Sequence, residues 1–231
     1  MPVTKQIEIL LSSVQKFSAA YGIPVVKGVD ENSKLFIAWV PYLNNLKTGT
    51  ANELLDGAVS SLREAAACAA LGLIRPSLLA MRTEIDLIFG WLYFKDHPVE
   101  WEYVNSKSDG FKLKKEILDY LLKYYESFGA RFGTLKDIKT RVEQDPYRLL
   151  SAHIHSQSLN TIPLVDILAD VVDPKNVAME IVKISYEVDE FVSDILFAVY
   201  GENWTQLPKS LLVSLDSRFK TPNQKKVFFN P

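Results

Sequence analysis

The residues with the clearest chemical potential stand in one short segment, Asp145 to His155, which reads DPYRLLSAHIH. Two of the three histidines in the chain, His153 and His155, follow Arg148 by five and seven residues. Arginine carries a permanent charge on a planar group that binds phosphate oxygens, and histidine exchanges a proton near neutral pH. Such side chains are sufficient to cleave RNA without a metal. We therefore take Arg148, His155 and His153 as candidate catalytic residues.

The same segment has the features of a short amphipathic helix. Asp145 is suited to cap the first free backbone N–H groups, and Pro146 fits the first helical position. At about 100° per residue, His155 returns to the stripe of Arg148, whereas His153 lies about 140° away, at the edge of the leucine face. We therefore expect Arg148 and His155 to point into a common solvent-reachable cleft, with His153 more buried.

The pattern also has a non-catalytic explanation. An arginine and a histidine seven residues apart on a helix are usually a solvated surface pair. In that case His153 could be a hydrogen-bonded core histidine. A second structural explanation is that Arg148 forms a salt bridge with an acid such as Asp86 and that His155 merely lines the surface. His153 and His155 could share a metal ion on a strand but not on a helix, where they diverge by about 200°. The sequence therefore predicts no metal and no other cofactor.

Composition restricts how the chain can meet nucleic acid. Its 231 residues are 48% hydrophobic and 23% charged, with a formal net charge of −2. This balance is ordinary for a soluble globular protein and argues against a broad basic surface. Any RNA contact would have to be local. Two lysine clusters are candidates, although a solvated helix face is the more ordinary explanation of each: Lys107, Lys112, Lys114 and Lys115, or Lys220, Lys225 and Lys226.

Cysteine use and the N-terminal sequence predict the compartment. Cys68 is the single cysteine, so the chain can form no internal disulfide, which fits a reducing environment. No basic and then apolar leader opens the chain, and the apolar stretch from Ala65 to Ala80 is interrupted by Arg75 and Pro76. We therefore expect a cytoplasmic protein without a membrane contact.

Hydrophobic spacings of three and four dominate the chain and predict an all-α fold. We expect a single domain over residues 1–231, with a core in residues 50–200 or so and with the N-terminal helix and the C-terminal tail as extensions. Residues 35–40 fit either a short strand or a buried helical turn, and residues 219–231 are expected to be a tail. Helices are expected over residues 4–21 (ended by Gly22 to Pro24), 51–74, 76–94, 111–128 (closed by Gly129), 174–200 and 206–216, with short ones after Thr134 and after Asp145.

The order of these motifs resembles the HEPN superfamily, which consists of small all-α domains. Arg148 followed by His153 and His155 resembles its Arg-x4–6-His signature. The wider pattern is similar to a branch of bacterial HEPN-like proteins, with an Arg-x-x-x-acid element, a His-Pro-x-x-Trp-like turn and a Tyr-Arg-x-Leu-Ser helix in residues 82–86, 93–101 and 147–155. The resemblance implies a HEPN-like helical bundle with peripheral helices, which forms a homodimer through the motif helix.

The resemblance also implies two kinds of function. Many HEPN-like domains are metal-independent endoribonucleases of toxin–antitoxin, antiviral defence or RNA-processing systems, and others are inactive. In an active protein His155 or His153 would take the proton from an RNA 2′-OH, Arg148 would neutralise the phosphorane, and the products would carry 2′,3′-cyclic phosphate and 5′-OH ends. Leu149 stands where active members usually carry a polar residue. It favours the alternative, a non-catalytic module that binds a protein, nucleotide or nucleic acid. Candidate orienting partners of the catalytic groups are Asp86, Glu84, Ser151 and Tyr147.

Overall fold

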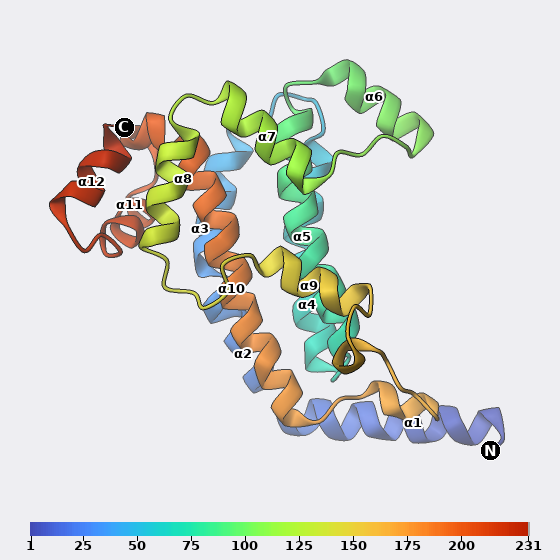
Figure 1. The fold of residues 1–231 in the computed structure, drawn as a ribbon. Coiled ribbons are helices and arrows are strands. Elements are labelled where there is room, and N and C mark those ends of the chain that lie inside the picture. The colour runs from blue at the N-terminus through green and yellow to red at the C-terminus, as the bar shows by residue number, and fades with distance from the viewer. Residues whose placement is uncertain (231) are drawn as a thin grey trace. The chain divides into compact units, whose positions relative to one another are not determined.

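The computed structural model describes residues 1–230, and all of their side chains except those of Asn160, Lys175 and Asn176. Within these residues the chain is helical and has no strand (Figure 1), which confirms the all-α prediction. The α-helices are α1 (Val3–Phe17), α2 (Ile23–Asn32), α3 (Lys34–Asn44), α4 (Asn52–Ala70), α5 (Ile74–Phe94), α6 (Pro98–Lys107), α7 (Lys114–Tyr124), α8 (Phe128–Asp137), α9 (Pro146–Ile154), α10 (Lys175–Tyr200), α11 (Lys209–Asp216) and α12 (Pro222–Phe229). A π-helical turn covers Ser18–Gly22, and 3-10 turns cover Leu159–Thr161, Leu168–Val171 and Gly201–Gln206.

The predicted end of the first helix at Gly22 to Pro24 is wrong. The π-helical turn leads directly from α1 into α2, with Gly22 in the right-handed helical region and Pro24 in the first turn of α2. A π turn already interrupts the regular hydrogen-bond ladder, so the missing N–H of Pro24 costs little there. The helical alternative for residues 35–40 is the one that α3 adopts.

The resulting helical stretch, Val3–Asn32, is long and apolar enough to cross a membrane by length and composition. The core helix of a soluble protein or a signal sequence meets the same criterion, and 17% of the most apolar window is buried. The cytoplasmic location and the absence of a membrane contact therefore stay predictions.

The predicted boundaries around Gly129 and Thr134 are also wrong. Tyr125 is extended and Ser127 is left-handed, at φ 60°, so the chain breaks before Gly129 rather than at it. The next helix, α8, then contains both Gly129 and Thr134, because it buries Phe128 and Leu135.

Besides α2, two helices lie where the sequence predicts none. The tail expected over residues 219–231 contains α12, whose first turn is held by a capping box in which Thr221 accepts the N–H of Gln224 at 3.2 Å. Phe228 of this helix is fully buried. The polar helix α6 buries only Val104, which explains why its hydrophobic periodicity is weak.

The chain forms two compact units. The first contains Met1–Ser33, Ser60–Glu84 and Asp145–Val188, and the second contains Lys34–Val59, Ile85–Gln144 and the residues from Asp189 onward. Helices α4, α5 and α10 each contribute one part to either unit, so the units are not separate stretches of chain. The expected single domain stays a prediction.

In the first unit, small residues allow helices to approach closely. A Cβ atom on Gly28 of α2 would lie 2.6 Å from Cγ1 of Val182 in α10, so this contact requires glycine. Ala65 of α4 is fully buried, and its carbonyl accepts the hydroxyl of Ser77 in α5 at 2.8 Å. These contacts agree with the close helix packing that the alanine-rich run indicates. Helix α1 lies along the 3-10 turn Leu168–Val171 (Figure 1).

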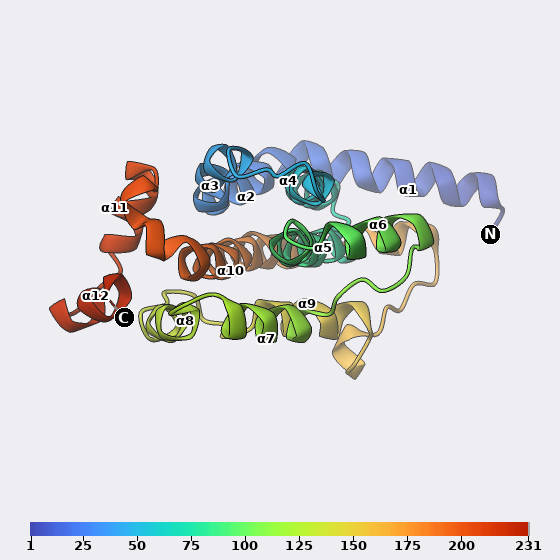
Figure 2. The same ribbon diagram turned by 90° about the horizontal axis from the view of Figure 1, so that it is seen from above.

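In the second unit, aromatic pairs join the helices. Trp39 of α3 packs edge-on against Phe197 of α10 at 4.8 Å between ring centroids, and Phe89 of α5 stacks on Phe191 at 6.2 Å. Figure 2 shows α3 on one side of this α5–α10 pair and α7 and α8 on the other. The carboxylate of Asp189 accepts the backbone N–H of Phe36 at 2.7 Å and so caps α3 from α10.

The second unit also contains a buried cluster of two arginines and two acids. Arg218 donates to Asp194 at 2.7 Å and lies 3.4 Å from Glu190, and Arg141 forms ion pairs with the same two carboxylates. The backbone N–H of Arg141 donates to Glu190 at 2.6 Å. Because the two charges of each sign cancel, the cluster can be buried, and it fixes the segment after α8 and the segment after α11 to α10.

Candidate functional site

Helix α9 carries the candidate catalytic residues and begins where the sequence predicts. The backbone N–H of Arg148 donates to the carbonyl of Asp145 at 3.0 Å, and Pro146 occupies the first turn. The predicted cap by the carboxylate of Asp145 does not form. The helix is instead positioned by packing, since Pro146 and Leu150 are buried.

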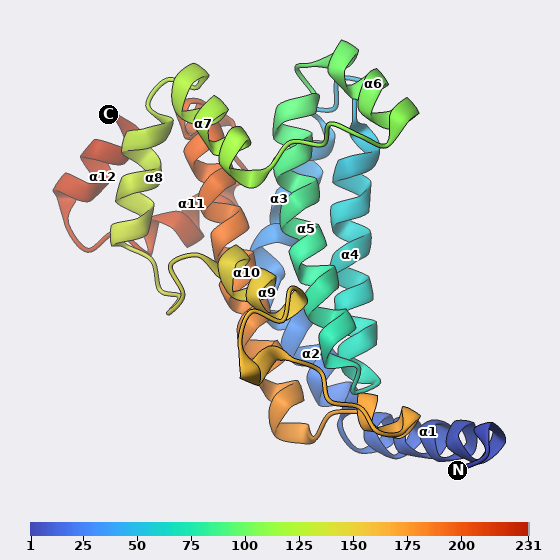
Figure 3. The same ribbon diagram turned by 45° about the vertical axis from the view of Figure 1, so that its right-hand side comes forward.

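Arg82 of α5 holds the first half of α9, which lies beside α5 in Figure 3. Its Nε atom donates to the hydroxyl of Ser151 at 3.0 Å, and its Nη2 atom donates to the hydroxyl of Tyr147. The guanidinium carbon also lies 4.4 Å from the centroid of the Tyr147 ring, within the range of a cation–π contact. The Arg82 guanidinium therefore binds both Tyr147 and Ser151, which we expected to orient the catalytic groups.

Arg75 of α5 holds the other end of α9. Its Nη2 atom donates to the carbonyl of Ile154 at 2.9 Å and to the hydroxyl of Ser156 at 3.3 Å. A cation at this position also complements the negative end of the helix dipole. Arg75 and Arg82 stand seven residues apart and so share one stripe of α5, which makes this spacing a signal that was readable in the sequence.

Arg148 and His155 are both exposed to solvent. The backbone N–H of His155 donates to the carbonyl of Ser151 at 2.9 Å, so His155 follows the helical path one residue beyond α9. Helical geometry therefore keeps it on the stripe of Arg148. Among the side chains that the structure describes, the Arg148 guanidinium has no hydrogen-bond or ion-pair partner, which leaves it available to a ligand.

His153 lies in a different environment. It is half-buried whereas His155 is exposed, the order of burial that the helical arithmetic predicts. Burial, and then the positive charge of Arg75, lower the pKa of His153 below its ordinary value. The neutral imidazole is therefore favoured at neutral pH, and it can accept a proton.

The two acids that we expected near the catalytic groups lie in different surroundings. Glu84 belongs to the first unit and is almost fully buried, at 2% exposure. Asp86 belongs to the second unit and is half-buried. The Arg148 side chain forms no ion pair with any described residue, so the salt bridge with an acid such as Asp86 is absent there. The exposure of Arg148 and His155 agrees both with a catalytic pair and with the solvated surface pair that was our other explanation.

None of the described pockets is lined by a residue of α9, and the common cleft of Arg148 and His155 stays a prediction. Among the same residues there is no group of three or more His, Cys, Asp or Glu side chains that could hold a metal ion. The arrangement on α9 is therefore an exposed cation and an exposed imidazole on a helix that two arginines hold at both ends.

Comparison of the chain with protein-family models, with curated proteins and with solved structures finds no match. The resemblance to HEPN domains therefore depends on Arg148, His153, His155 and the accompanying motifs of the sequence. Membership of that superfamily stays a prediction, and any function must be argued from the side chains of α9.

Proposed function

We propose that the chain is a metal-independent endoribonuclease of the toxin–antitoxin, antiviral defence or RNA-processing type, with its chemistry on α9. The observation that carries the proposal is the Arg148 guanidinium, which has no partner within residues 1–230 although it stands on a firmly held helix. A planar cation that is exposed and unpaired can bind a phosphate through two parallel hydrogen bonds. His155 follows on the same stripe and supplies a group for proton transfer.

The proposed reaction uses the 2′-hydroxyl of RNA as the nucleophile. An imidazole of α9, His155 in our assignment, accepts the 2′-OH proton while the oxygen attacks the adjacent phosphorus. Arg148 stabilises the negative charge that develops on the phosphorane oxygens. The 5′-oxygen leaves with a proton from a second imidazole, which gives a 2′,3′-cyclic phosphate and a 5′-OH.

The second imidazole leads us to propose a homodimer with the α9 helices near a two-fold axis. His153 is half-buried beside Arg75, so one chain presents a single exposed imidazole on α9. A two-fold axis near α9 would supply another His155 and another Arg148. Sedimentation equilibrium tests this proposal, and a strictly monomeric mass well above micromolar concentration contradicts it.

The decisive experiment incubates the purified chain with single-stranded RNA in EDTA and analyses the ends of the products. We expect cyclic-phosphate ends, and we expect Arg148→Ala and His155→Ala each to lower the rate by about a hundredfold or more. Both side chains are exposed, so the melting temperature should change little. Arg63→Ala is the matched control, because Arg63 is another exposed arginine of the first unit. If His153→Ala removes activity and His155→Ala does not, the assignment of the base is wrong.

A non-catalytic binding module is the second candidate function. The observation that favours it is that the hydroxyls of Tyr147 and Ser151 both accept hydrogen bonds from Arg82, a contact that serves to position α9. Arg148 would then bind a phosphate or carboxylate of a protein, nucleotide or nucleic acid. Binding of RNA that is lost with Arg148→Ala, without any cleavage, supports this alternative over the first.

A further inference from the structure

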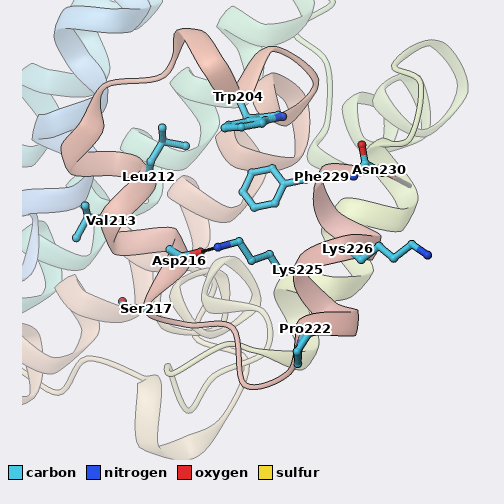
Figure 4. Close-up of a pocket in the computed structure, with 10 residues that line it drawn as sticks. All are labelled: Trp204, Leu212, Val213, Asp216, Ser217, Pro222, Lys225, Lys226, Phe229 and Asn230. Carbon is cyan, nitrogen blue, oxygen red and sulfur yellow. Dashed lines mark hydrogen bonds and ion pairs between the residues drawn. The ribbon is translucent and has the colours of Figure 1, made fainter.

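A surface groove lies between α11 and α12 in the second unit, with a volume of about 840 Å³ (Figure 4). The rings of Trp204 and Phe229 pack edge to face at 5.0 Å between centroids and form one end of it. Leu212 and Val213 of α11 continue the apolar wall, and Asp216 and Lys225 form an ion pair between the two helices. The groove is thus apolar at one end and crossed by a charged pair at the other.

The walls of this groove are open to solvent. Val213 is 60% exposed and Trp204 is 39% exposed, and Phe229 is half-buried. Pockets for small ligands usually enclose most of the ligand surface, which these residues cannot do. A groove of exposed apolar side chains between two helices instead fits an elongated partner that lays one face into it.

The groove is lined by two lysines, Lys225 and Lys226, and one acid, Asp216, and the segment that forms it has an excess of lysine on a chain whose net charge is −2. Residues 201–230 carry four exposed lysines against only two acids, Glu202 and Asp216; the single arginine of this stretch, Arg218, is buried among carboxylates. Within the part of the chain that the structure describes, three of these lysines form no ion pair: Lys209, Lys220 and Lys226. Lys226 points outward at the rim in Figure 4. The charge complement of this surface is acidic.

We propose that the groove between α11 and α12 binds an acidic amphipathic helix of a partner protein. Apolar side chains spaced by three, four and seven residues would enter the end formed by Trp204, Phe229 and Leu212. Acidic side chains along the edge of that helix would pair with Lys226 and with Lys225. The Asp216–Lys225 pair is about half exposed on both sides and so stabilises the free chain little, which leaves Lys225 free to change partner. This interaction is independent of RNA cleavage on α9.

The test uses a display library of helical peptides of about 16 residues, long enough to form four turns. Each peptide has apolar residues along one stripe, and its polar positions are drawn equally from Glu, Lys and Gln. Selection on the intact chain should enrich Glu over Lys at positions beside the stripe. A selected peptide, measured by fluorescence anisotropy, should bind more weakly in 0.5 M salt than in 0.05 M salt, because exposed charges are screened.

Variants locate the binding site. Val213→Glu places an acid on an exposed wall position, so the chain should fold normally and lose at least about tenfold in affinity. Trp204→Ala and Lys226→Glu should do the same. The matched controls are Tyr103→Ala and Lys107→Glu, which make the same kinds of change on exposed positions of α6 and should leave affinity unchanged.

Four outcomes would overturn the proposal. The first is enrichment of basic or neutral helices, and the second is binding that survives Val213→Glu. The third is a sedimentation mass that falls with Trp204→Ala, which would make the groove an interface between copies of this chain. The fourth is that the peptides do not bind, whereas decanoate (a probe for a small amphipathic anion) or a single-stranded RNA binds and loses affinity with Val213→Glu. That result would identify a small anion or a nucleic acid as the occupant.

Discussion

Replacing Arg82 by methionine tests whether α5 holds the helix that carries the candidate catalytic residues. Methionine retains an unbranched apolar side chain but removes the hydrogen bonds to Tyr147 and Ser151 and the cation–π contact. A hydrogen bond from a charged donor contributes about 1.5–3 kcal/mol, and a cation–π contact about 0.5–1 kcal/mol at exposed sites. Because Arg82 is half-buried and water competes for its guanidinium, we expect a total loss of about 1.5–3 kcal/mol in the free energy of unfolding.

The assay is urea unfolding of the two single variants Arg82→Met and Tyr147→Phe and of the double variant. If Arg82 binds Tyr147 as the distances indicate, the double variant should lose about 0.5–1.5 kcal/mol less than the sum of the single losses. Arg63→Met is the control, since Arg63 is exposed on α4 and should stay within about 0.5 kcal/mol of the unmodified chain.

Amide hydrogen exchange then connects this stability to the site. Loss of the Arg82 contacts should accelerate exchange in α9 more than in α4. The reasoning is refuted if Arg82→Met is no less stable than Arg63→Met, or if the losses of Arg82→Met and Tyr147→Phe simply add. Either result would mean that α9 is held by the packing of Pro146 and Leu150 and by Arg75, without a contribution from Arg82.

Three further predictions concern the scaffold. Asp194→Asn should cost about 3–5 kcal/mol in chemical unfolding, because it leaves two buried arginines with the single carboxylate of Glu190; a loss below about 1 kcal/mol would contradict this. Burial raises the pKa of Asp189 to about 7, above the unfolded value of about 3.9. Between about pH 3.9 and about pH 7 the folded chain therefore binds more protons than the unfolded chain, and the free energy of unfolding falls as the pH rises through this range. Asp189→Asn should remove that fall, and unfolding at pH 5 and pH 8 measures it. Gly28→Ala should lower the melting temperature at a cost of about 1–3 kcal/mol, and adding Val182→Ala should restore part of it, unless the clash at 2.6 Å is relieved by backbone movement.

The sequence predicts the long helices well and the short ones poorly. Helices α4, α5 and α10 each bury a continuous stripe over many turns, so their three-four periodicity is repeated often enough to be read. α6 buries little more than Val104, and the capping box of α12 at Thr221 and Gln224 is too short a signal within a lysine-rich tail. The glycines suggest helix ends at Gly22 and Gly129, and both predictions are wrong. At Gly22 a π-helical turn continues the helix, and near Gly129 the break is made by the left-handed Ser127.

For the candidate site, the rotation of about 100° per helical residue predicts where the side chains of α9 lie around the helix, but not which residues they contact. The stripe shared by Arg148 and His155 and the greater burial of His153 follow from about 100° per residue. The hydrogen bonds from Arg82 to Tyr147 and Ser151 depend on how α9 packs beside α5. The spacing of residues within α9 cannot predict that packing. Long-range pairs of this kind must be seen in the structure.

The arginines of α5 and α9 differ in whether their side chains have partners in the structure. Arg75 and Arg82 each bind uncharged acceptors of the segment from Tyr147 to Ser156, so their contacts here serve to hold a helix. Arg148 stands on that helix, is exposed, and has no partner within residues 1–230. An arginine kept for stability alone would gain by pairing with an acid, because unpaired exposure adds nothing to folding. Arg63 is also exposed and has no partner among the described residues, so what distinguishes Arg148 is its place on the helix that Arg75 and Arg82 hold, seven residues before His155. The proposed phosphate site depends on that position.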